Sequence, residues 1–188
     1  MIKGARILLR PVQDKDWPTI EDWGRDKDAL WGSYQRFQLD HLPLLRQAYQ
    51  ETGLLKRESG FLLVETIQDQ EVIGFVRYSL IPFPDADMSY PEIGFGIPKV
   101  SARGKGYGRD AVNLLVEYLF AGYPVERIIA FTDRENSSAQ RLMQGLGFQQ
   151  EGTLRHSTFR DGRWRDMLIH SILRIEHDLN INKGEQNE

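Results

Sequence analysis

The stretch "ARGKGYGRDAVNLLVEYLF" (residues 102–120) decides the fold, because it runs from a glycine-rich turn directly into an apolar helix. Three glycines fall within five positions, and basic side chains flank them. Each glycine weakens a helix or strand by about 0.5–1 kcal/mol relative to alanine, so this turn must need bare backbone. The glycines are Gly104, Gly106 and Gly108, and the basic neighbours are Arg103, Lys105 and Arg109.

A glycine-rich turn between a strand and a helix is typical of a phosphate site. The first N–H groups of a helix have no partner within it, and the helix dipole favours an anion there. The apolar strand "EIGFGI" (92–97) precedes the turn, and an amphipathic helix follows it. A flexible, solvated loop is the alternative, but these flanking elements favour the phosphate site. The spacing fits neither the dinucleotide fingerprint nor the P-loop.

The bulk composition limits the classes of function. The chain has 188 residues, 40% of them hydrophobic and 27% charged, which is ordinary for one soluble globular domain. Its net charge of −3 argues against a nucleic-acid binder. The absence of cysteine excludes disulfides, thiolate metal sites and a cysteine nucleophile. No segment reads as a signal peptide or a membrane span, so we expect a cytoplasmic protein without membrane attachment.

The pattern of apolar residues predicts strands and helices in mixed order. "NSSAQRLMQGLGF" (136–148) is the clearest helix, with Asn136 as N-cap and Gly147 as its left-handed stop. The Asp-Gly turn in "RDG" (160–162) predicts a closing hairpin. We expect a sheet with helices on its faces, an α/β class in the broad sense. The predicted strands cover residues 5–12, 61–67, 71–81, 92–97 and 125–132 and the two arms of that hairpin.

Four motifs in order resemble the GNAT superfamily of N-acetyltransferases. Residues 103–108 match the acetyl-CoA loop of the family, [RQ]-x-x-G-x-[GA], and residues 136–148 resemble its Asn-helix-Gly-Phe segment. The opening "LLRPVQDKDW" resembles the branch that acetylates ribosomal-protein N-termini and small amines. The late "RDGRWRDMLIHSILRIEH" resembles its final hairpin. The similarity covers residues ~6–178.

The resemblance implies the GNAT fold. Its central sheet is mixed and mostly antiparallel, with about seven strands and about four flanking helices. The fourth and fifth strands splay apart in a V that holds the pantetheine arm of the donor. One domain would cover residues 1–178, and we expect residues 179–188 to form a polar, disordered tail.

The resemblance also implies acetyl-CoA as co-substrate, with its diphosphate on the amides of residues 104–108. Backbone near Gly96 and Ile97 would polarise the acetyl carbonyl. Asn136 would hydrogen-bond the pantetheine or its neighbourhood, and plain N-capping is its alternative role. The expected donor-binding residues are Gly96, Ile97, Arg103, Gly104, Lys105, Gly106, Tyr107, Gly108, Arg109 and Asn136.

The reaction needs a base, because an alkyl amine with a pKa of about 10.4 arrives protonated at neutral pH. We nominate Glu92, for which a solvent-facing carboxylate is an equal alternative; Glu21, Asp22, Asp85 and Asp87 are weaker candidates. Family members often carry Ser or Tyr as general acid where this chain has Ala139 and Met143. Tyr107 or water could substitute. We expect direct attack in a ternary complex, since no cysteine is available.

The resemblance implies a primary amine as acceptor, and we expect either a small molecule or a peptide N-terminus. Trp31, Tyr34 and Phe37 follow one another at helical spacing, and we expect them to contact an apolar or cationic acceptor. Trp17 and Trp23 read as core. The four histidines show no metal-ligand spacing, so we expect no metal. A non-catalytic acetyl-CoA-binding sensor or interaction module is the alternative function, and the sequence leaves a homodimer open.

Overall fold

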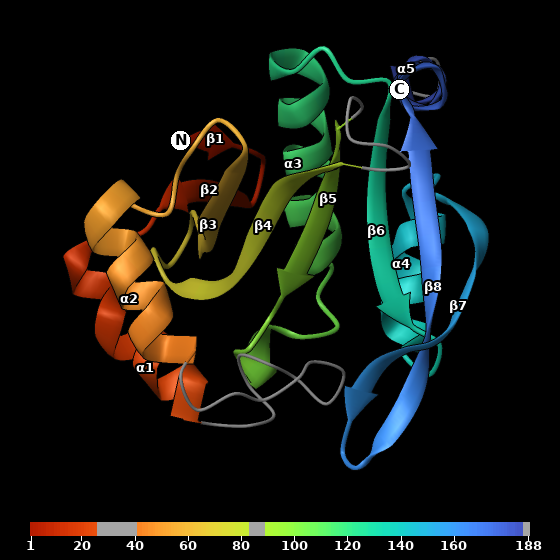
Figure 1. Ribbon diagram of the computed structural model, residues 1–188. Coiled ribbons are helices and arrows are strands. Elements are labelled where there is room, and N and C mark those ends of the chain that lie inside the picture. Colours follow the sequence, from red (N-terminus) through yellow and green to blue (C-terminus); the bar gives the residue numbers. More distant parts are fainter. Residues whose placement is uncertain (26–40, 83–88, 186–188) are drawn as a thin grey trace. The chain divides into compact units, whose positions relative to one another are not determined.

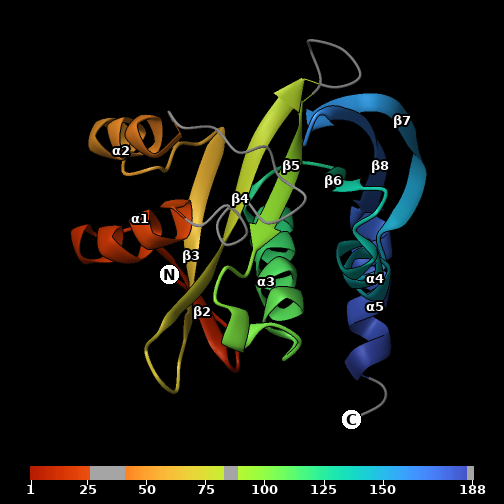
Figure 2. The same cartoon turned by 90° about the horizontal axis from the view of Figure 1, so that it is seen from below.

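The computed structural model describes residues 1–25, 41–82 and 89–185, and of residues 180–185 the backbone alone (Figures 1 and 2). These residues form eight strands and five α-helices. The strands are β1 (Ile2–Lys3), β2 (Ile7–Pro11), β3 (Ser59–Thr66), β4 (Val72–Pro82), β5 (Ser89–Gly96), β6 (Arg127–Asp133), β7 (Gln149–Arg160) and β8 (Arg163–Leu173). The helices are α1 (Trp17–Arg25), α2 (His41–Thr52), α3 (Tyr107–Gly122), α4 (Ser137–Gly145) and α5 (Arg174–Glu185), with short 3₁₀ turns η1 (Asp14–Asp16) and η2 (Val100–Ala102).

The strands form one mixed sheet in the order β1-β2-β3-β4-β5-β6-β8-β7. The β5–β6 ladder is parallel, and the β1–β2, β2–β3, β3–β4, β6–β8 and β7–β8 ladders are antiparallel. The mixed, mostly antiparallel sheet is therefore confirmed. The sequence predicted about seven strands, and the eighth is β1. Two residues are too short to give a periodic signal, so β1 is visible only through its pairing with β2.

The parallel β5–β6 ladder is short. Its register pairs Glu92 with Ile129 and Ile93 with Ala130. A ladder of two pairs is compatible with strands that diverge beyond it. The V-shaped splay itself stays a prediction.

By its internal contacts the chain divides into two compact units. The first comprises residues 1–79 and 94–115, and the second comprises residues 80–93 and 116–188. In the first unit, α1 and α2 lie side by side in both views (Figures 1 and 2). The core beneath them is formed by Val12, Trp17, Ile20, Trp23, Leu63 and Phe75. The prediction that Trp17 and Trp23 are core residues is thus confirmed.

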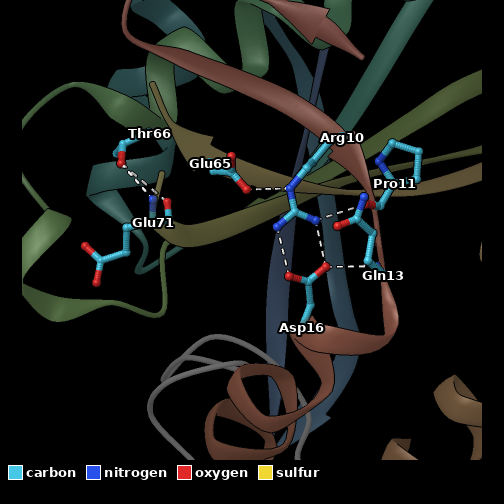
Figure 3. Close-up of polar contacts among 7 residues, drawn as sticks. All are labelled: Arg10, Pro11, Gln13, Asp16, Glu65, Thr66 and Glu71. Carbon is cyan, nitrogen blue, oxygen red and sulfur yellow. Dashed lines mark hydrogen bonds and ion pairs between the residues drawn. The ribbon is translucent and has the colours of Figure 1, made fainter. Parts of the chain in front are cut away.

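A buried ion-pair network fixes the start of α1 (Figure 3). The guanidinium of Arg10 donates to both oxygens of Asp16, at 2.6 and 2.8 Å, and to Glu65 at 2.5 Å. Asp16 also accepts from the amide of Gln13 at 2.8 Å. Burial alone would raise the pKa of Asp16, but the hydrogen bonds from Arg10 and Gln13 outweigh it and lower the pKa. The "LLRPVQDKDW" motif therefore anchors the first helix.

In the second unit, β6, β8 and β7 carry α4 and α5. The β7–β8 hairpin turns at Asp161 and Gly162, both in the left-handed region with φ of 50° and 76°, as the sequence predicted. At the C-terminal end of α3, the Arg174 guanidinium donates to the carbonyls of Phe120, Tyr123 and Val125 at 2.7–3.0 Å. These bonds satisfy acceptors that a helix end leaves open.

The C-terminal end differs from the expected disordered tail, because α5 continues through residues 179–185. The first turn of α5 is held by Arg174 and by His177, which is buried and lies 5.1 Å from the Phe120 ring. No proline or glycine occurs between residues 174 and 183 to end the helix. A fifth helix thus replaces most of the predicted tail. Among the described residues, no helix is both long enough and apolar enough to span a membrane.

Candidate active site

The glycine-rich turn leaves its amides unused. Gly104 and Gly106 adopt left-handed φ of 74° and 85°, which accounts for glycine at these two positions. In the described part of the chain, no N–H of residues 104–108 donates to a backbone carbonyl. The first backbone bond of α3 runs from the Asp110 N–H to the Gly106 carbonyl, at 3.1 Å. The turn therefore offers exposed donors at a helix N-terminus, which suits an anion.

Arg103 ties this turn to the end of β5. Its guanidinium donates to the carbonyls of Ile97 at 2.7 Å and Pro98 at 3.1 Å. We expected Arg103 to add charge beside the turn; its hydrogen bonds also hold the connection between β5 and the loop. Lys105 and Arg109 are exposed. The structure thus joins Ile97, Arg103 and the glycine turn into one surface of the first unit.

Arg6 reaches the same turn from the other end of the chain. It donates to Asp110 at 2.9 Å and to the Lys105 carbonyl at 3.1 Å, and its guanidinium lies 5.1 Å from the Tyr107 ring centroid. Sequence reasoning missed Arg6. It lies 104 residues from Asp110, and no local pattern marks such a contact.

The end of β5 is built for close backbone approach. A Cβ on Gly74 would lie 2.3 Å from the Gly96 carbonyl oxygen, and a Cβ on Gly96 would lie 2.7 Å from the Phe75 ring. Because C=O and N–H of a trans peptide point in opposite directions, the Gly96 carbonyl facing β4 directs the Ile97 N–H away from β4. Ile97 therefore presents a fixed backbone donor at the point where β5 ends.

Glu92 is half-buried on β5 and lies opposite Ile129 in the β5–β6 ladder. Strand alternation puts Glu92, Gly94 and Gly96 on one face of β5. A Cβ on Gly94 would lie 2.7 Å from Nε of Arg77, an exposed residue of β4 that the sequence analysis did not single out. Gly94 is thus bare because the Arg77 side chain crosses it. The only available sequence signal was the alternation of glycines in "EIGFG".

Asn136 caps α4. Its side-chain oxygen accepts from the Ala139 N–H at 3.1 Å, so the capping role is confirmed. This cap uses only the oxygen, and the amide nitrogen keeps two donors for another acceptor. Ala139 and Met143 are buried, with 9% and 0% of their surface exposed. In α4 the family's usual hydroxyl positions therefore belong to the packed core.

The predicted acceptor residues Trp31, Tyr34 and Phe37 lie outside the described residues, as do Asp85 and Asp87. The weaker base candidates are on α1. Glu21 pairs with Arg46 at 2.6 Å, and Asp22 pairs with Arg25 at 3.3 Å. Within the described ranges, no group of three or more His, Asp or Glu side chains could hold a metal ion.

Comparison with known proteins gives one family. The family model for the acetyltransferase (GNAT) domain matches residues 6–149. Among curated relatives, the N-acetyltransferase p20 of Bacillus licheniformis is 33% identical over 110 residues, 58% of this chain but only 60% of p20. The probable N-acetyltransferase YjcK of Bacillus subtilis is 29% identical over 92% of this chain and 97% of its own. Spermidine N(1)-acetyltransferase of Escherichia coli is 32% identical over 40% of each chain.

Solved structures share the fold. Spermidine N-acetyltransferase of Vibrio cholerae, in complex with CoA and spermine, superposes with a TM-score of 0.77 at 22% identity, covering 93% of this chain and 99% of that one. Ribosomal-protein-S5-alanine acetyltransferase of Vibrio fischeri gives 0.69 at 22% identity, over 91% and 94% of the two chains. At this identity the likeness shows the fold.

Proposed function

Because the chain belongs to the GNAT acetyltransferase family, we propose that it moves an acetyl group from acetyl-CoA to a primary amine by direct attack in a ternary complex. The observation that carries this proposal is the row of open amides at residues 104–108. A site that serves only the fold would have closed them with its own carbonyls or side chains.

On the donor side, these amides and the α3 dipole would hold the diphosphate of acetyl-CoA, with Lys105 and Arg109 adding positive charge nearby. The donor supplies the reactive thioester. The Ile97 N–H, directed away from β4, would donate to the thioester oxygen as negative charge develops on it. The two open N–H groups of Asn136 would bind the pantetheine arm.

On the acceptor side, we infer a small amine or a peptide N-terminal amine. Two observations support this class: a relative named as a spermidine N(1)-acetyltransferase, and a fold neighbour named as a ribosomal-protein-S5-alanine acetyltransferase. Glu92 would take a proton from the ammonium group of the acceptor, so that the neutral amine can attack, since Glu92 is half-buried on the face of β5 that ends at Gly96. Trp31, Tyr34 and Phe37 remain our candidates for contacts to the acceptor.

The thiolate would leave without help from a hydroxyl group, because Ala139 and Met143 stand where family members often carry Ser or Tyr. A thiol has a pKa of about 8.5, so its thiolate is a tolerable leaving group near neutral pH. A general acid contributes about 10²–10⁴ in rate, so its absence slows the reaction rather than preventing it. Tyr107 or water would serve where protonation is needed.

The alternative is a non-catalytic acetyl-CoA-binding sensor or interaction module. One observation favours it: the positions that carry the family's acid are buried, apolar residues of α4.

A paired experiment decides between the two. We expect acetyl-CoA to raise the melting temperature, and thiol release to occur with spermidine or with an alanine-initiated peptide. Glu92→Gln should lower kcat by about 10²–10⁴ while retaining the thermal shift. Glu58→Gln, on an exposed carboxylate, is the matched control. A thermal shift without turnover of either acceptor would favour the sensor, and no shift would overturn both functions.

A further inference from the structure

The glycine turn is held from behind by one side chain, that of Arg6. Its Nε and Nη2 lie 2.9 and 2.7 Å from Oδ2 of Asp110, and its Nη1 donates to the Lys105 carbonyl at 3.1 Å. All three guanidinium nitrogens are therefore engaged on the loop and on the first turn of α3. Three of its five N–H groups are used in this way, so Arg6 acts on the turn itself.

The backbone of Arg6 is also held in place. Its carbonyl accepts from the Ile67 N–H at 3.0 Å, just past the end of β3. In the preceding turn, a Cβ on Gly4 would lie 2.9 Å from the Leu114 side chain, so that turn packs against α3. The backbone at Arg6 is thus held to the sheet and the helix before its side chain reaches the loop.

The bond to Lys105 sets the direction of the next amide. In a planar trans peptide the C=O and N–H groups point in opposite directions. Because the Lys105 carbonyl faces Arg6, the Gly106 N–H faces away from Arg6, on the side of the loop that is open. The guanidinium also fills the space behind Gly106, where a Cβ would lie 2.9 Å from Nη2.

Arg6 also neutralises the one acidic side chain in the first turn of α3. Asp110 is half-buried and would repel a diphosphate bound at the same helix end. The ion pair turns that carboxylate into the anchor for Arg6. Arg6 thus orients the Gly106 N–H and also neutralises the Asp110 charge, and both effects would increase the affinity of this turn for an anion.

We infer that Arg6 is a positioning residue for the diphosphate of the acetyl donor, through the Lys105–Gly106 peptide and Asp110. This inference rests on the proposed function, because it takes residues 104–108 to be the diphosphate site. It assigns Arg6 to affinity for the phosphate-bearing part of CoA, not to the acyl-transfer step.

The test compares two ligands on two variants by NMR titration. CoA carries the diphosphate, and pantetheine lacks it. Arg6→Gln should raise the Kd for CoA about tenfold, which is the loss of roughly one charge-assisted hydrogen bond, and should leave the Kd for pantetheine unchanged. Arg6→Lys keeps the charge but cannot reach Lys105 and Asp110 together, so its Kd for CoA should lie between those of the wild type and Arg6→Gln. Arg25→Gln, at an exposed pair on α1, should bind both ligands as the wild type does.

The outcomes distinguish the role of Arg6 from the proposed binding of CoA. A rise in Kd confined to CoA supports it, and so does a Gly106 amide signal that shifts with CoA in the wild type but not in Arg6→Gln. Equal weakening of both ligands would show a merely structural role and overturn it, as would a wild-type Kd for CoA in Arg6→Gln. If the wild type itself bound no CoA, the proposed function would fail with it. Should Arg6→Gln not fold, Arg6→Lys decides by the same comparison.

Discussion

The N-terminal ends of α3 and α4 are built in opposite ways. At α4 the chain closes its own helix: Asn136 accepts from Ala139, Asp133 accepts from the Glu135 N–H, and Gln140 donates to the carbonyls of Asp133 and Arg134. At α3 the preceding glycines bring no side chain to the helix end, and the amides of residues 104–108 donate to no carbonyl of the described chain.

The difference separates what serves the fold from what serves a ligand. A capping side chain stabilises a helix by about 1 kcal/mol, and left-handed glycines add flexibility to the unfolded chain. The start of α3 lacks a capping side chain, and its left-handed glycines make the unfolded chain more flexible. Such a helix end is less stable than a capped one, and open amides at a helix N-terminus suit a bound anion. The following variants test this distinction.

The largest loss of stability should come from the buried ion-pair network at the start of η1 and α1. Arg10→Met leaves Asp16 as a buried charge without its partner, and we expect a loss of about 3–5 kcal/mol in unfolding free energy. Denaturant unfolding measures it. Arg25→Met, at a pair whose side chains are 70% and 74% exposed, should change stability little. Similar losses in the two variants would contradict the assignment of the Arg10 network to the fold.

The second-largest effect should come from a substitution in the glycine-rich turn that precedes α3. Gly106→Ala places a side chain at a φ of 85° and against Arg6, and the strain of about 1–3 kcal/mol falls on the loop. We expect acetyl-CoA to bind at least about tenfold more weakly, by titration. Gly53→Ala is the matched control, because Gly53 also has a left-handed φ, of 63°, with open space around it. Equal CoA affinity in both variants would sink the diphosphate assignment.

The cap of α4 can be divided into its two proposed roles. Asn136→Ala removes the cap and should lower stability by about 1 kcal/mol. Asn136→Asp keeps an oxygen for the Ala139 N–H but removes both amide donors. If Asn136 also binds the pantetheine arm, Asn136→Asp keeps the melting temperature but raises the KM for acetyl-CoA. An unchanged KM would leave Asn136 with the cap alone.

The smallest effect concerns β8, which pairs with β6, the strand that leads into α4. His170 of β8 is fully buried beside Thr132 of β6, and burial lowers its pKa. The unfolded chain then binds a proton more readily than the folded one, so stability is lost as pH falls below about 6.5. Melting temperatures from pH 7.5 to 5 should fall less steeply in His170→Gln. Parallel curves would remove His170 as the cause.

Local signals predicted the elements that local physics controls. The helix at 136–148 was readable because its cap, its stop at Gly147 and the buried Phe148 all lie within 13 residues. The 160–162 hairpin was readable from its turn chemistry. By contrast, β1 and the extent of α5 depend on tertiary contacts, with β2 and with Phe120 respectively, and no periodicity marks them.

The candidate site shows the same division. The bare turn at residues 104–108 was visible, because glycine and charge are local properties. The hydrogen bonds of Arg103 to the end of β5, the crossing of Gly94 by Arg77 and the contact of Arg6 with Lys105 were not visible. The first of these spans six residues and the last spans 99, and each depends on where a side chain turns after the backbone has folded.

β7 has one further consequence. It is a 12-residue strand at the border of the sheet, and a long flat border strand is a template for joining other chains. Its pairing with β8 is interrupted twice, between Gln150 and Gly152 and between Leu154 and Thr158, and His156 within the second interruption has a φ of 50°. Bulges of this kind interrupt the regular row of amides that an edge strand offers, and we expect them to hinder pairing of β7 with another chain.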